Sequence, residues 1–142
     1  MTITSEVAVD ASIWVDLSIP SDPRHTVTRQ WFNGLVSNGG SVVAPSILLA
    51  EVAGAVSRQT GRLRLGHQVL SSLLTNRSVR LIPVDAILAE AAAELAVDLR
   101  LRGADAVYVA VAQRFGVPLV TWDQEQLQRA AAVVATRTPA TV

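Results

Sequence analysis

The sequence predicts an α/β protein, built as a single α/β/α sandwich around a central parallel sheet of four to five strands. Short apolar runs alternate along the chain with segments of helical periodicity, and strands separated by helices pair in parallel through right-handed crossovers. The strand runs are uniformly apolar, as expected when helices cover both faces of a sheet. The length of 142 residues suits one domain.

Five apolar runs are the expected strands, at residues 7–9, 41–44, 79–84, 119–121 and, as an edge strand, 133–135. The segments between them have helical periodicity and are expected to form helices at residues 12–17, 23–37, 46–59, 62–76, 85–101, 104–115 and 123–131. We expect one domain over residues 1–135 and a flexible tail over residues 136–142.

Cap and break signals set the boundaries of these helices. Ser12, Asp22 and Asp85 carry side-chain acceptors at expected N-caps, and Asp22 is followed by a proline that suits the first helical position. Gly61 and Gly103 separate neighbouring helical segments. The order of elements therefore follows from the sequence with no repeat and no interdomain linker.

The charged residues restrict the chemistry that the protein can perform. Twelve arginines balance twelve acidic residues, and the chain contains neither lysine nor cysteine. This excludes a P-loop lysine, Schiff-base chemistry, thiolate zinc sites and a cysteine nucleophile. Only carboxylates, hydroxyls and arginines remain as abundant functional groups.

The sequence gives no sign of a membrane or of export. No apolar run approaches the ~18–20 residues that a membrane span needs, and the first ten residues lack the apolar core of a secretory signal. We therefore expect a cytoplasmic protein.

Four acidic residues occupy positions that need an explanation. Asp10 and Asp123 follow apolar strands, so both face the edge of the sheet where ligand sites form. Glu51 projects from the apolar face of its helix, and Asp105 lies in the first turn of a largely apolar helix.

Each acid also has a structural explanation. Asp10 can accept hydrogen bonds from the amides of the next loop, and Asp105 can interact with the partial positive charge at the N-terminus of its helix. Asp123 can cap its helix in a capping box with Gln126. Glu51 can pair internally with an arginine. If the four acids converge instead, their repulsion calls for a hard divalent cation such as Mg²⁺ or Mn²⁺, which suits hydrolysis of phosphodiester bonds.

Four motifs, at residues 7–12 (VAVDAS), 45–52 (PSILLAEV), 104–110 (ADAVYVA) and 119–123 (LVTWD), resemble the PIN-domain family. Within that family, the chain is similar to VapC-type toxin ribonucleases of toxin–antitoxin pairs. The resemblance implies a PIN-like fold and a metal-dependent endoribonuclease that acts as the toxin of a type II toxin–antitoxin system. It implies a homodimer that is silenced by a small cognate antitoxin.

The resemblance also assigns roles to individual residues. It implies that the catalytic and metal-binding residues are Asp10, Glu51, Asp105 and Asp123, with Mg²⁺ as the cofactor and Mn²⁺ as an alternative. It implies that Ser12 and Thr121 supply supporting hydroxyls.

The RNA substrate would need cationic contacts, for which arginines near the motifs are candidates: Arg58, Arg62, Arg64, Arg100 and Arg102. Each of them can equally be an ordinary surface residue. The alternative function is a non-catalytic PIN-like module that binds RNA or a partner. The absence of lysine argues against haloacid-dehalogenase-like and receiver-type domains, which also place an aspartate after the first strand.

Overall fold

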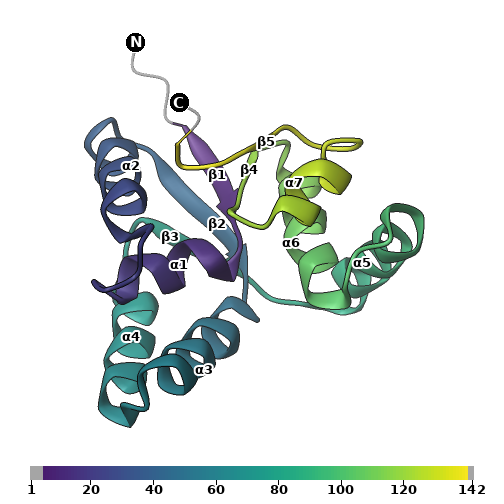
Figure 1. The fold of residues 1–142 in the computed structure, drawn as a ribbon. Helices are drawn as coiled ribbons and strands as arrows, with labels where there is room; N and C mark the ends of the chain where they lie inside the picture. The colour runs from purple at the N-terminus through teal and green to yellow at the C-terminus, as the bar shows by residue number, and fades with distance from the viewer. Residues whose placement is uncertain (1–4, 141–142) are drawn as a thin grey trace.

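The computed structural model describes residues 5–140 and confirms an α/β fold in which helices flank a five-stranded parallel sheet (Figure 1). The strands are β1 (Glu6–Val9), β2 (Ser41–Pro45), β3 (Val79–Ile82), β4 (Leu119–Val120) and β5 (Thr136–Arg137). The helices are α1 (Ala11–Ser18), α2 (His25–Ser37), α3 (Leu48–Thr60), α4 (Leu63–Thr75), α5 (Ala86–Leu99), α6 (Gly103–Phe115) and α7 (Gln124–Ala130). Within the described residues, no helix is long and apolar enough to cross a membrane.

The strand order is β3-β2-β1-β4-β5, with every neighbouring pair parallel. The chain moves outward from β1 in one direction through β2 and β3, then returns to the other side of β1 for β4 and β5. Right-handed crossovers then place α1–α4 on one face and α5–α7 on the other, as Figure 1 shows. The order reverses between β1 and β4, which is where ligands bind in sheets of this kind.

Helix α6 occupies the centre of its face and packs across β1, β2 and β4. Small apolar side chains permit this close approach, and Ala106, Val109 and Ala112 are fully buried. The uniformly apolar character of this helix therefore reflects a central position. Its first turn, which carries Asp105, lies at the carboxyl edge of the sheet.

Several boundaries differ from the expected ones for local reasons. Helix α2 begins at His25 rather than at residue 23, because Asp22 accepts a hydrogen bond from the Arg24 amide in a turn that precedes the helix. Helix α5 ends at Leu99, where Arg100 adopts a left-handed conformation with φ of 55°.

The expected edge strand at residues 133–135 is wrong by three residues. The amides of Val133 and Val134 both donate to the Ala130 carbonyl, so these two residues continue the turn that ends α7, and hydrogen bonding to β4 begins at Ala135, whose carbonyl accepts from the Leu119 amide. The fifth strand is β5 at Thr136–Arg137, inside the segment expected to be a tail. Residues 141 and 142 of that segment lie outside the described residues.

Two carboxyl groups interact between α1, which carries Asp16, and the turn before α2, which carries Asp22. Asp16 is buried at 7% exposure, and its carboxyl group is hydrogen-bonded to that of Asp22. Burial raises the pKa of Asp16 to about 7, and the negative charge of Asp22 adds to this rise, whereas Arg24 and Thr28 oppose it. Asp16 therefore holds a proton at moderately acidic pH.

We predict that an Asp16→Asn variant becomes more stable relative to the wild type as the pH rises from 5 to 8. An unfolded aspartate titrates near pH 3.8, so the folded protein binds more protons between that value and about 7. The free energy of unfolding of the wild type therefore falls as pH rises through this window. The variant lacks this titration. Melting temperatures of both proteins across the range measure the effect, and parallel curves would contradict it.

Candidate functional site

Asp10 lies between β1 and α1, and two hydroxyl groups hold its carboxylate. Ser12 Oγ donates to Asp10 Oδ1 at 2.6 Å, and Thr121 Oγ1 donates to Oδ2 at 2.6 Å. Asp10 is buried at 5% exposure. Its partners are therefore hydroxyls, one from α1 and one from the residue after β4, rather than the loop amides considered from the sequence.

The same two hydroxyls hold the loop between β4 and α7. Ser12 Oγ accepts from the Trp122 amide at 3.3 Å, and Thr121 Oγ1 accepts from the Asp123 amide at 3.0 Å. Each hydroxyl thus accepts a hydrogen bond from a backbone amide and donates one to Asp10. This relay fixes the loop that carries Asp123 to the end of β1.

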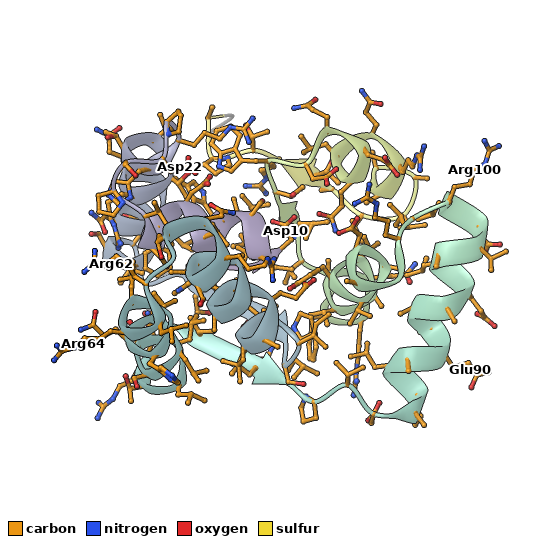
Figure 2. The ribbon with its side chains drawn as sticks, turned by 60° about the horizontal axis from the view of Figure 1, so that its bottom comes forward. Asp10, Asp22, Arg62, Arg64, Glu90 and Arg100 are labelled. Carbon is orange, nitrogen blue, oxygen red and sulfur yellow. The ribbon has the colours of Figure 1, made fainter. Side chains whose placement is uncertain are left out.

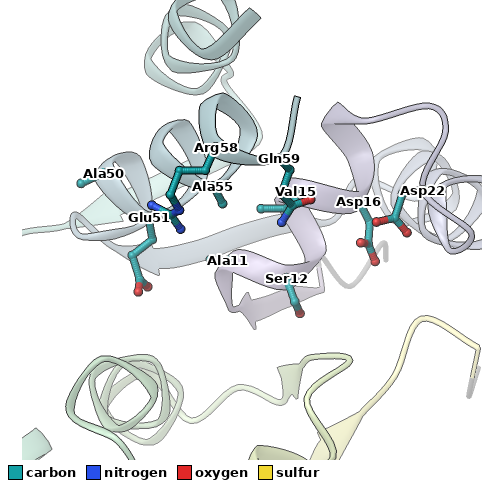
Figure 3. Close-up of a pocket in the computed structure, with 10 residues that line it drawn as sticks. All are labelled: Ala11, Ser12, Val15, Asp16, Asp22, Ala50, Glu51, Ala55, Arg58 and Gln59. Atoms are coloured by element: carbon teal, nitrogen blue, oxygen red, sulfur yellow. The ribbon is translucent and has the colours of Figure 1, made fainter. Parts of the chain in front are cut away.

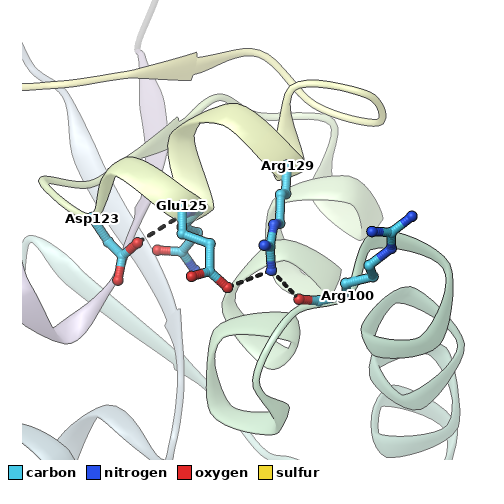
Figure 4. Close-up of polar contacts among 5 residues, drawn as sticks. Arg100, Asp123, Glu125 and Arg129 are labelled. Carbon is cyan, nitrogen blue, oxygen red and sulfur yellow. Dashed lines mark hydrogen bonds and ion pairs between the residues drawn. The ribbon is translucent and has the colours of Figure 1, made fainter.

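Asp123 caps α7, because its Oδ1 accepts from the Gln126 amide at 2.9 Å (Figure 4). The expected capping box is incomplete, since the fully buried Gln126 side chain turns away and donates to the Asp105 carbonyl at 3.0 Å. Gln126 thereby ties α7 to the first turn of α6. Sequence reasoning missed this role, because a glutamine at that spacing indicates only a cap.

Glu51 lies in the first turn of α3 and has a phenol as its partner. The Tyr108 hydroxyl donates to Glu51 Oε1 at 2.5 Å, and among the described residues no arginine forms an ion pair with Glu51. The internal Glu–Arg pair considered from the sequence is therefore absent from this region. Burial, followed by the bond and the charge of Glu51, raises the pKa of Tyr108, so the phenol remains a hydrogen-bond donor.

Electrostatic coupling shows that the four acids share one region. Burial raises the pKa of Asp10 to about 6, against the lowering by Ser12 and Thr121, and the charges of Asp105 and Asp123 raise it further. Burial also raises the pKa of Asp105, followed by the charges of Asp123 and Glu51, while Arg102 opposes the rise. The charges of these acids therefore reach one another, and their convergence on one metal ion stays a prediction. The catalytic roles of these acids remain predictions.

The donor chemistry of this region fits a hard divalent cation. All four side chains offer carboxylate oxygens, which Mg²⁺ and Mn²⁺ prefer. Within residues 5–140, no three histidine, cysteine, aspartate or glutamate side chains lie close enough to share one metal ion. Mg²⁺ keeps several waters and is usually held by one or two carboxylates, so it does not require three direct protein ligands.

A pocket of about 560 Å³ opens beside the acids between α1 and α3 (Figure 3). Glu51 lies toward one end of it and Asp16 and Asp22 lie toward the other, with Ser12 between them in Figure 3. Arg58 and Gln59, on the last turns of α3, also line it.

The five arginines predicted to contact RNA fall into two groups. Arg58 lines the pocket, and Arg102 acts electrostatically on Asp105. Arg62 and Arg64 lie at one outer edge of the molecule and Arg100 at the opposite edge, with Asp10 between them (Figure 2). The backbone of Arg100 has a structural role, since its carbonyl accepts from Arg129 (Figure 4).

Trp122 borders the site on the side of α2. Its indole N–H donates to Thr28 Oγ1 at 3.0 Å, and the Arg24 guanidinium lies 4.7 Å from the centre of its ring. One face of the ring is therefore covered by a cation. Arg24 did not emerge from sequence reasoning, because it is 98 positions away from Trp122 and belongs to no motif.

Similar folds occur among solved toxin structures. The chain is similar to VapC20 of Mycobacterium tuberculosis, described as a sarcin–ricin loop cleaving toxin, with a TM-score of 0.74, 23% identity, and coverage of 91% of this chain and 96% of that chain. VapBC2 from Rickettsia felis, bound to a DNA fragment from its promoter, has a TM-score of 0.72, 17% identity and coverage of 94% and 98%. FitAcB from Neisseria gonorrhoeae has a TM-score of 0.71, 18% identity and coverage of 96% and 99%.

The family is identified by sequence. None of the curated proteins matches the chain at a significant level. Residues 7–133 match the PIN domain, a span that includes all four motifs with their acids. The chain therefore belongs to the PIN domain family.

Proposed function

We propose that this protein is a metal-dependent endoribonuclease that hydrolyses RNA phosphodiester bonds as the toxin of a type II toxin–antitoxin system. The observation that carries the proposal is the buried Asp10 where the strand order reverses, because burial, and after it the charges of Asp105 and Asp123, raises its pKa to about 6. The family and the similar toxin folds support it, since one of those toxins is described as cleaving the sarcin–ricin loop.

The chain's own residues would prepare the site. Ser12 and Thr121 hold Asp10 in one orientation, and Asp123 is fixed by the helix that it caps. Asp10, Glu51, Asp105 and Asp123 would hold the cation, which when bound supplies charge neutralisation and a more acidic water. Arg58 lies in the adjoining pocket, where a phosphate group of RNA could bind it.

One observation favours the alternative of a non-catalytic binding module. No three acids among the described residues lie close enough to bind one metal ion. A bound ion would therefore need water molecules as further ligands, or side chains would have to move. The experiment that separates the two functions is incubation of RNA with the purified protein and Mg²⁺ or Mn²⁺. RNA binding without cleavage in either metal would support the module.

We predict that replacing Asp10, Glu51, Asp105 or Asp123 singly by its amide reduces RNA cleavage on the order of 100-fold or more, at the upper end of what loss of a metal-supporting group costs. The amide keeps the shape of the side chain and removes the charge that would hold the metal. Circular dichroism should show an unchanged fold. Asp98→Asn is the matched control, because Asp98 is an exposed acid on α5. Wild-type rates in two or more site variants would contradict the assignment.

A second prediction concerns RNA docking. Neutralising Arg58 and Arg102 together to glutamine should weaken RNA binding and reduce the slope of log K against log salt by about 1.4, the value for two lost single-strand phosphate contacts. Fluorescence anisotropy at several salt concentrations measures the slope. The control is the double variant of Arg62 and Arg64, which lie at the outer edge (Figure 2). Equal slopes for both double variants would contradict a special role for the pocket arginine.

A third prediction concerns partners: we expect a homodimer that a small antitoxin inhibits. Large apolar side chains remain exposed on α4 and α5, including Leu63, Leu74, Ile87 and Val97, which suits association between copies. A basic side chain of the antitoxin would pair with the acidic site. Co-expression with the neighbouring open reading frame, light scattering and an RNA assay test both parts. A monomer at high micromolar concentration would contradict the dimer, and a neighbour that leaves cleavage unchanged would contradict the antitoxin.

A further inference from the structure

The only tyrosine of the chain lies on α6 within a stretch of small apolar residues. Tyr108 is 1% exposed, and its buried neighbours on the helix are alanines and valines. A phenylalanine would fill the same space without a polar atom. A buried phenol needs a hydrogen-bond partner, so the presence of this hydroxyl calls for a specific explanation.

The hydroxyl of Tyr108 joins two helices from opposite faces of the sheet. Its partner is Glu51 Oε1 on α3, 57 residues earlier in the chain, at 2.5 Å. Within the described residues, this is the hydrogen bond that the Glu51 side chain forms, and Glu51 Oε2 has no protein donor there. One carboxylate oxygen is thereby fixed while the other is left for a further ligand.

The bond removes freedom that would otherwise scatter the Glu51 carboxylate. A glutamate side chain has three rotatable bonds and loses conformational entropy when it is ordered. Tyr108 is three residues after Asp105 on the same helix, so the phenol also sets where Glu51 lies relative to Asp105. Glu51 is thus positioned before any cation arrives.

We propose that Tyr108 is a positioning residue that orients Glu51 for a divalent cation, an inference that rests on the proposed nuclease function. Tyr108 contacts neither the cation nor RNA in this arrangement and acts through Glu51. Groups that orient metal ligands in this way typically contribute a factor of about 10–100 to metal affinity. Loss of the hydroxyl should therefore affect metal binding before it affects chemistry at saturating metal.

The first test is the Tyr108→Phe variant, titrated with Mg²⁺ while the melting temperature is followed. The Mg²⁺ concentration at half of the stabilisation should rise about 10-fold relative to wild type, whereas kcat at saturating Mg²⁺ should change little. The matched control is Thr136→Val, which removes a hydroxyl that donates to the Leu127 carbonyl at 2.9 Å on β5. The control should leave the Mg²⁺ midpoint at its wild-type value.

The second test reads the phenol directly and does not depend on the variant or on activity. Protein labelled with carbon-13 at Cζ of tyrosine gives a single resonance, because the chain has one tyrosine. Addition of Mg²⁺ should shift this resonance with the same midpoint as the thermal stabilisation. In the absence of metal, Glu51→Gln should shift it and Asp98→Asn should leave it in place.

These outcomes separate the two proposals. If the wild type cleaves RNA but Tyr108→Phe keeps the wild-type Mg²⁺ midpoint, the positioning role is overturned and the nuclease function stands. The positioning role is also overturned if the Cζ resonance does not shift at Mg²⁺ concentrations that stabilise the wild type. If the wild type neither cleaves RNA nor responds to metal, both proposals fall.

Discussion

The carboxylate of Asp10, held between two hydroxyls, is the contact on which the site depends. Ser12 and Thr121 each take a backbone hydrogen bond from the β4–α7 loop and donate to Asp10, so the ends of the two central strands are joined through one buried acid. The Asp123 amide belongs to the same hydrogen-bond network, so the network also fixes the position of Asp123 after β4. A change at any of these hydroxyls would disturb two acids together.

Helix N-termini supply the second constraint. Asp10 and Asp123 are N-caps, and Glu51 and Asp105 lie in first turns, so four helices direct their amino ends toward one edge of the sheet. The partial positive charge at these ends favours carboxylates. Burial, and after it the charges of neighbouring acids, nevertheless keeps the pKa values of Asp10 and Asp105 raised. The structural explanations of Asp105 and Asp123 are thus compatible with a shared site.

Sequence patterns predicted the order of elements and the four acids, because strand ends and first helical turns are local features. They could not predict Tyr108 as the partner of Glu51, since that contact joins helices from opposite faces of the sheet. Nor could they predict Gln126, whose spacing fits a capping box equally well. The position of β5 was missed because the apolar residues 133 and 134 serve the turn after α7, while the less apolar Thr136–Arg137 pairs with β4. Periodicity does not distinguish these uses.

Two buried acids, Asp16 in the lining of the pocket and Asp10 next to the lining residues Ala11 and Ser12, are accommodated in different ways. Asp16 holds a proton up to about pH 7, because it is buried and the negative charge of Asp22 lies beside it. Both oxygens of Asp10 instead accept from hydroxyl groups, which stabilise the charged form. A proton on Asp16 therefore relieves the repulsion there, whereas at Asp10 burial raises the pKa to about 6 against the lowering by the two hydroxyls, so this carboxylate stays mostly charged at neutral pH.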